Sequence, residues 1–150
     1  MALSLAAVVD AREKLRAAKP EDKMAVFAVL MRLRQICCDP RLVADNWSGG
    51  SAKLDACMEL VTAAVEGGHR ILLFSQFTSM LDLLAQRLDE AGVSHFTLQG
   101  STPKPVRAER VRRFNAGEAS VFLISLRAGG TGLNLTAADI VIHYDPWWNV

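Results

Sequence analysis

A glycine-rich run, Gly129-Gly130-Thr131-Gly132, has the residue types best suited to contact a ligand. Glycine lets a ligand or a nucleic-acid phosphate approach the backbone N–H groups closely. The run begins like the fingerprint of dinucleotide-binding proteins, but Leu135 stands where its third glycine belongs. Too few residues, 127–138, join the flanking apolar segments to form the full helix that would hold a pyrophosphate. A close approach of ligand or phosphate is the favoured interpretation, and simple backbone flexibility is the alternative.

Other kinds of site are poorly supported. The chain lacks the Gly-x-x-x-x-Gly-Lys-Ser/Thr pattern that cradles a nucleoside triphosphate, so it cannot anchor one in that way. His69, His95 and His143 are scattered and no Cys-x-x-Cys occurs, which argues against a metal site. No Gly-x-Ser-x-Gly elbow surrounds Ser75 or Ser125. We therefore expect neither a bound metal nor a serine nucleophile.

Two further features each allow two interpretations. Between residues 103 and 117, one acid, Glu109, stands among five basic residues: Lys104, Arg107, Arg110, Arg112 and Arg113. This pattern suits either a polyanion-binding surface or a solvated helix face. Trp147 and Trp148 are either core residues or exposed aromatic residues that bind a partner.

Length and composition limit the architecture that must position these residues. The chain has 150 residues, of which 51% are hydrophobic and 22% charged, as expected for one globular domain with a sizeable core. The longest apolar run, residues 24–31, is far shorter than a membrane span, so we expect no membrane partner. Three cysteines, two of them adjacent, indicate a reducing intracellular compartment.

The pattern of elements changes near residue 46. Residues 1–45 show helical periodicity only, ending at Asp39-Pro40, and are interpreted as a helical lead-in. Residues 46–150 alternate helices with short apolar strands. Ser51, a capping box of Ser79 with Asp82, and Thr102-Pro103 are predicted to start the three helices. Glycines at 67–68, 92 and 117 are predicted to end them. The predicted strands are 71–74, 95–98, 121–125 and 140–144.

Helices between successive strands indicate right-handed crossovers and an α/β fold, a three-layer parallel sheet covered on both faces. Ligands bind such sheets beyond the carboxyl ends of the strands. The loops to inspect are therefore 75–79, 99–103, 126–136 and 145 onward, which hold most of the unusual polar, glycine and aromatic residues.

Several segments together resemble one protein family. The run 125–139, SLRAGGTGLNLTAAD, and the following HYDPWWN at 143–149 closely resemble helicase motif V and its extension in the Swi/Snf-type ATP-dependent DNA translocases, the chromatin remodellers. LFSQF at 73–77 resembles motif IV, GSTP at 100–103 resembles motif IVa, and LRQIC at 33–37 resembles the block that opens their second lobe. The resemblance covers about residues 24–149.

The resemblance implies a RecA-like second lobe, of the P-loop NTPase kind, from a two-lobed motor that hydrolyses ATP and moves along double-stranded DNA. It assigns a nucleotide-binding role to Gly130, Gly132 and Asn134. It assigns contacts with the DNA backbone to six residues: Ser75, Gln76, Thr102, Ser125, Arg127 and Trp147. No residue of this chain is assigned a catalytic role.

The sequence departs from the family at a few positions. Arg127 replaces a lysine but keeps the charge that a phosphate needs, Gln99 replaces an aspartate, Asp39-Pro40 replaces His-Pro, and Val150 replaces a proline. Motif VI would begin beyond Val150, and the first lobe with its P-loop is not in the chain. The 150 residues alone are therefore expected to hydrolyse no ATP and to bind neither ATP nor magnesium tightly.

The resemblance also implies partners: double-stranded DNA, an N-terminal RecA-like lobe and DNA-bound proteins. ATP and magnesium are the expected cofactors of the two-lobed protein. The alternative function is a RecA-like module that binds nucleic acid or protein without hydrolysis. Alanine-rich composition favours a bacterial cytoplasm or nucleoid, with the nucleus as the location in a eukaryote.

Overall fold

A computed structural model describes residues 9–10, 12–14, 16–17, 23–44, 46–129 and 132–146. The chain forms two compact units, Met1–Lys53 and Leu54–Val150. The domain boundary expected at 45/46 stays a prediction. In the described residues no helix is both long and apolar enough to cross a membrane.

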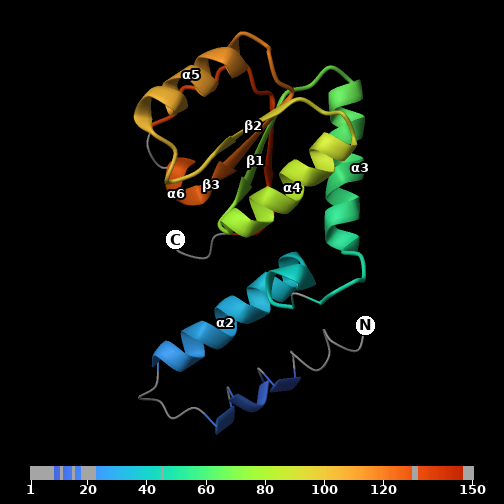
Figure 1. Ribbon diagram of the computed structural model, residues 1–150, viewed down its shortest axis with the longest axis vertical. Coiled ribbons are helices and arrows are strands. Elements are labelled where there is room, and N and C mark those ends of the chain that lie inside the picture. The colour runs from blue at the N-terminus through green and yellow to red at the C-terminus, as the bar shows by residue number, and fades with distance from the viewer. Residues whose placement is uncertain are drawn as a thin grey trace. The chain divides into compact units, whose positions relative to one another are not determined.

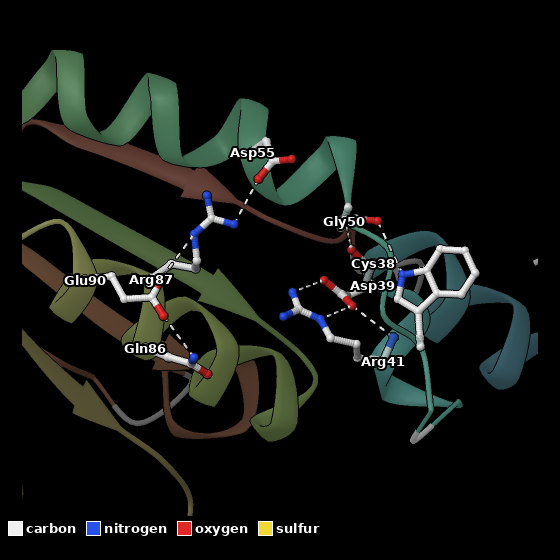
Figure 2. A network of polar contacts seen from close by, with 10 residues as sticks. Cys38, Asp39, Arg41, Gly50, Asp55, Gln86, Arg87 and Glu90 are labelled. Carbon is white, nitrogen blue, oxygen red and sulfur yellow. Dashed lines mark hydrogen bonds and ion pairs between the residues drawn. The ribbon is translucent and has the colours of Figure 1, made fainter. Parts of the chain in front are cut away.

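The first unit contains helix α2 (Lys23–Cys38) and the short 3-10 helix η1 (Pro40–Leu42). The fully buried carboxylate of Asp39 separates them, accepting from the Arg41 backbone N–H at 2.9 Å and from the Arg41 guanidinium at 2.9 and 2.7 Å (Figure 2). The predicted helix end at Asp39-Pro40 is confirmed. At this position the family's usual histidine is replaced by an acid that forms an internal ion pair.

The second unit is an α/β domain with one parallel sheet, which confirms the predicted fold class. Its elements are α3 (Ala52–Glu66), β1 (Ile71–Ser75), α4 (Thr78–Glu90), β2 (His95–Leu98), α5 (Lys104–Asn115), β3 (Val121–Ser125), α6 (Leu126–Gly129) and β4 (Ile140–His143). All neighbouring strands are parallel, in the order β2-β3-β1-β4. Helices α3 and α4 lie on one side of the sheet and α5 on the other (Figure 1).

Alternate residues of the buried strands point to opposite faces of the sheet and contribute to a hydrophobic core on each face. On one face Leu72, Phe122 and Ile124 pack with Phe114 of α5, and the Phe114 and Phe122 rings are 5.2 Å apart. On the other face α3 and α4 contribute fully buried leucines, including Leu54 and Leu84. Arg87 of α4 also binds Asp55 of α3 at 2.9 Å (Figure 2). This two-sided burial makes the central strands a rigid base for the loops that follow them.

Two predicted helix starts are wrong. Helix α4 begins at Thr78 after Phe77, which makes no side-chain capping bond, so the capping box of Ser79 with Asp82 does not form. The turn begins earlier because the Ser75 hydroxyl accepts the Phe77 N–H at 3.2 Å. Helix α5 begins at Lys104, and Pro103 precedes it rather than occupying its first position. The predicted ends of α3, α4 and α5 are confirmed, with positive φ at the glycines (84°, 66° and 89°) at 68, 92 and 117.

A polar clasp holds the start of β4 against the start of β1. The Asp139 carboxylate contacts Nδ1 of His69 at 2.7 Å and accepts the Arg70 backbone N–H at 2.9 Å. The backbone N–H groups of Asp139 and Ile140 both donate to the Arg70 carbonyl. The hydrogen bond from His69, followed by that from Arg70, lowers the pKa of Asp139 below its ordinary value.

This clasp predicts an acid-sensitive contact. A carboxyl group with a lowered pKa favours the folded state above its unfolded pKa, and that contribution is lost as pH falls through the folded pKa. His69→Ala should move the Asp139 pKa partly back toward its ordinary value, because the Arg70 N–H remains. Carboxyl titration by NMR would check this, with His95→Ala as the control. An unchanged Asp139 midpoint in His69→Ala would contradict the assignment.

Candidate functional site

The predicted site residues follow strands that end at the same level. Ser75 pairs in register with Ser125, so the last residues of β1 and β3 are neighbours. Leu98 of β2 pairs with Ile124, and His143 of β4 pairs with Phe74, one residue earlier on each central strand. The loops after all four strands therefore emerge along one edge of the sheet, as the sequence predicted.

Ser75 and Gln76 are bound to the segment that follows β4. The Ser75 hydroxyl donates to Oδ1 of Asp145 at 2.5 Å, and the Gln76 backbone N–H donates to Oδ2 at 3.1 Å. Ser75 is fully buried, and only 2% of Asp145 is exposed. The side-chain amide nitrogen of Gln76 is buried and makes no hydrogen bond within the described part of the chain. The Ser75 hydroxyl is thus used inside the protein.

Ser125 and Arg127 differ sharply in their surroundings. The buried Ser125 hydroxyl accepts the Ala128 N–H at 3.3 Å, which begins the four-residue helix α6. Arg127 lies on that helix, exposed, and among the described residues it makes no ion pair or hydrogen bond. Its guanidinium is therefore available to an anion at the edge.

Thr102 closes the loop after β2. Its hydroxyl accepts the Gln99 N–H at 3.0 Å, and its own N–H donates to the Gln99 carbonyl at 3.0 Å. The Gln99 side chain contacts Asp82 of α4 at 3.4 Å. These bonds fix the shape of the loop that leads into α5 and its first residue, the exposed Lys104.

The segment between α6 and β4 alternates between half-buried and exposed residues over 132–135. Leu133 and Leu135 pack against the core on the α5 side, whereas Gly132 and Asn134 are exposed. Gly132 has a φ of +66°, and a Cβ there would meet no described atom within 4 Å. Glycine is therefore required by the backbone conformation and not by a lack of space. Gly130 and Trp147, two other predicted site residues, lie outside the described residues.

Helix α5 supports this segment. Asn115, its last residue, donates to the Asn134 carbonyl at 2.9 Å and accepts the Ala137 N–H at 3.2 Å. Arg107 reaches the Ala128 carbonyl at 3.4 Å. Each end of the glycine-rich segment is thus tied to the helix that precedes β3.

The basic residues of α5 are largely engaged within the protein. Arg112 binds Glu109 at 2.7 Å, Arg113 binds Glu118 at 2.6 Å, and Arg110 donates to the Thr97 carbonyl. The Arg112 guanidinium lowers the pKa of Glu109. The exposed ion pairs of Arg112 and Arg113 agree with a solvated helix face, and the polyanion-binding interpretation stays a prediction.

Sequence reasoning missed Asp145, Asn115 and the internal role of Arg107. Asp145 was recognised only as part of the HYDPWWN run, and Asn115 only as a helix end. Asparagine at the last position of a helix, followed by glycine two residues later, is a common stop signal. Nothing in that signal says that its side chain binds a loop nineteen positions away.

Comparisons with known proteins agree with this fold. Residues 52–150 match the family described as the helicase conserved C-terminal domain. The chain is 39% identical over 133 residues to the putative ATP-dependent helicase/translocase YwqA of Bacillus subtilis, covering 85% of this chain and 14% of that protein. It is 38% identical over 141 residues to the mouse SWI/SNF-related matrix-associated actin-dependent regulator of chromatin subfamily A member 1, with the same coverages.

Solved structures of SWI2/SNF2 ATPases are also similar to this chain. The C-terminal domain of a Sulfolobus solfataricus SWI2/SNF2 ATPase matches with a TM-score of 0.83 and 28% identity, covering 99% of this chain and 67% of that one. The core of that ATPase in complex with double-stranded DNA matches with a TM-score of 0.84 and 26% identity, covering 99% of this chain and 32% of that one.

The chain belongs to the helicase C-terminal domain family. Within that family it is a C-terminal RecA-like lobe of the SWI2/SNF2 type of ATPase, as the sequence predicted. It spans 14% of the length of the two curated relatives described above.

The support from α5 predicts a local effect of Asn115. Asn115→Ala should lower the free energy of unfolding by about 1–2 kcal/mol, because two hydrogen bonds of about 1 kcal/mol each are lost. Amide exchange at Ala137 should become faster. Asn115→Asp is the matched variant, since it keeps an acceptor for Ala137 and loses the donor to Asn134. Equal exchange at Ala137 in Asn115→Ala and in the unmodified chain would contradict the role of this side chain.

Proposed function

We propose that this chain is the second motor lobe of an ATP-dependent double-stranded DNA translocase or remodeller. One edge of its sheet contacts the DNA backbone and contributes part of the ATP cleft. The observation that carries the proposal is the exposed Arg127, without a protein partner in the described residues, on the edge where the family's motifs meet. The DNA-bound Sulfolobus structure, which resembles this chain, supports the choice of ligand.

The DNA contacts are proposed for the six residues named from the sequence, in two groups. Arg127, Thr102 and Trp147 contact phosphates or sugars directly, and Gln76 joins them by turning its buried, unpaired side-chain amide toward a phosphate when DNA binds. The buried Ser75 and Ser125 act through the loops that their hydroxyls hold. Lys104 adds a second exposed cation at the start of α5. Such contacts give affinity without base selectivity.

The ATP site is proposed for the part of motif V that follows Arg127, residues 130–134. Gly132 and Asn134 fit a nucleotide because both are exposed and the Gly132 backbone leaves open space around its Cα. Gly130 is expected to contribute with them. ATP and its magnesium ion would supply the phosphoryl transfer that drives movement. The side chains here would bind and orient the nucleotide, while the N-terminal lobe, the proposed partner, would hold its phosphates.

The proposed translocase moves along chromosomal DNA inside the cell, and DNA-bound proteins are its further proposed partners. The helicase and translocase names of its relatives support this location. A lobe that binds DNA without any DNA-stimulated hydrolysis in the two-lobed protein would favour the alternative, a binding module.

Reversing the charge of Arg127 tests the DNA-facing side. In a two-lobed protein that carries this lobe, Arg127→Glu should abolish DNA-stimulated ATP hydrolysis and flatten the salt slope of DNA binding by about one unit. ATP binding without DNA should hardly change. Arg112→Glu makes the same change in net charge on a residue already paired with Glu109, and should leave the slope unchanged. Equal slopes in both variants would contradict the assignment.

Gly132 tests the nucleotide-facing side. Gly132→Val should weaken ATP binding first, because a β-branched residue is strained at a φ of +66° even though its side chain meets open space. Nucleotide titration with and without DNA would check this. A loss of DNA affinity that is as large as the loss of ATP affinity would show that the two sides of motif V are not separate.

A further inference from the structure

Asp145 is a buried acid at the edge of the sheet where the strands have their carboxyl ends. It lies two residues beyond the end of β4, and 2% of the residue is exposed. Burial of a carboxylate is costly unless hydrogen-bond donors surround it. Here each oxygen has one donor, from the Ser75 hydroxyl at 2.5 Å and the Gln76 backbone at 3.1 Å.

A carboxylate suits this position better than an amide of the same shape. Both groups that face Asp145 are donors, and a carboxylate offers acceptors only. The amide of an asparagine keeps both contacts only if the Ser75 hydroxyl turns round to accept its N–H, and the bond to Ser75 then loses its charge assistance. The contact is therefore stronger with an acid than with an amide.

The contact joins two motifs that are far apart in sequence. The Ser75 hydroxyl that donates to Asp145 also accepts the Phe77 N–H, so one carboxylate determines the path of residues 75–77. Gln76, a proposed DNA contact, is the central residue of this turn. On the other side, Trp147 follows Asp145 by two residues in the sequence. Displacement of Asp145 would therefore affect the turn after β1 and the described start of the segment after β4, residues 144–146.

We propose that Asp145 is a positioning residue that couples the turn after β1 to the segment after β4, so that both meet the DNA backbone together. The inference rests on the proposed function. Asp145 itself contacts no DNA, because it is buried and its oxygens are used. Its removal should weaken DNA-dependent activation without removing a phosphate contact.

Strand β4 offers a matched control at its other end. Asp139 also accepts a backbone N–H from the β1 side and a side-chain donor, but it is exposed and lies at the opposite edge of the sheet. Asp139→Asn therefore loosens the same strand with the same change of atoms. If Asp145 only stabilised β4, the two substitutions would have the same consequences.

The coupling can be measured first in the chain itself. Asp145→Asn should speed amide exchange at Gln76 and Phe77 and leave the strand residues of β2 unchanged. Asp139→Asn should leave Gln76 and Phe77 unchanged. Equal protection of Gln76 and Phe77 in the unmodified chain and in Asp145→Asn would overturn the inference.

The functional test uses the two-lobed protein. Asp145→Asn should raise the DNA concentration needed for half-maximal ATPase stimulation by about three- to tenfold, as expected when one charge-assisted hydrogen bond becomes a neutral one. The salt slope of DNA binding should stay unchanged, because Gln76 carries no charge. Asp139→Asn should leave both quantities unchanged. Equal behaviour of the two variants would overturn the inference.

Ser75→Ala extends the test to the partner of Asp145. If the Ser75 hydroxyl acts through Asp145, the double variant should be little worse than either single one. Additive losses would mean that Ser75 and Asp145 act independently of each other, and would overturn the coupling. An unmodified two-lobed protein whose ATPase is not stimulated by DNA would overturn the proposed function itself, a result distinct from stimulation that Asp145→Asn leaves intact.

Discussion

The loops at the carboxyl ends of the strands depend on one constraint. Backbone groups just beyond the last paired strand residues must find hydrogen-bond partners outside the sheet. Beyond Ser75 and Ser125 the strands no longer pair, and the next backbone N–H groups need other acceptors. Short hydroxyl side chains provide them, because Ser75 accepts from Phe77 and Ser125 accepts from Ala128. The serines that end the strands therefore also shape the loops. Exposed residues in these loops, such as Arg127, are held in place by those hydrogen bonds.

Helix α5 extends this support to the longest loop. Leu133 and Leu135 bury one side of the segment against the α5-facing core, and Asn115 binds its backbone from the helix end. Gly132 and Asn134 are then presented on the opposite, exposed side. Alternation of apolar and polar residues in an extended segment is enough to produce this division. One side of the segment is thus fixed to the core, and the other side is left accessible to a ligand.

The sequence predicted most of the fold because its signals were local. Buried apolar runs and glycine stops marked all four strands and the ends of three helices, and parallel connectivity placed their loops on one edge. The predicted starts of α4 and α5 were wrong because Ser79 and Pro103 have local propensities that the neighbouring contacts override. The bonds of Asp145 and Asn115 could not be predicted, since each depends on a partner brought close only by folding.

The engagement of the α5 arginines changes how the charge of this lobe should be interpreted. A run of five basic residues with one acid suggests a polyanion-binding surface, yet Arg112 and Arg113 are paired with acids and Arg110 is bound to a backbone carbonyl. A cation already paired with an acid must compete with that acid when it binds a phosphate, at a cost of about 0–1 kcal/mol for an exposed pair. Arg127, one exposed residue beyond a buried serine, has no such cost in the described structure. Local pairing, together with the density of charge along the sequence, therefore influences how strongly each cation can bind an anion.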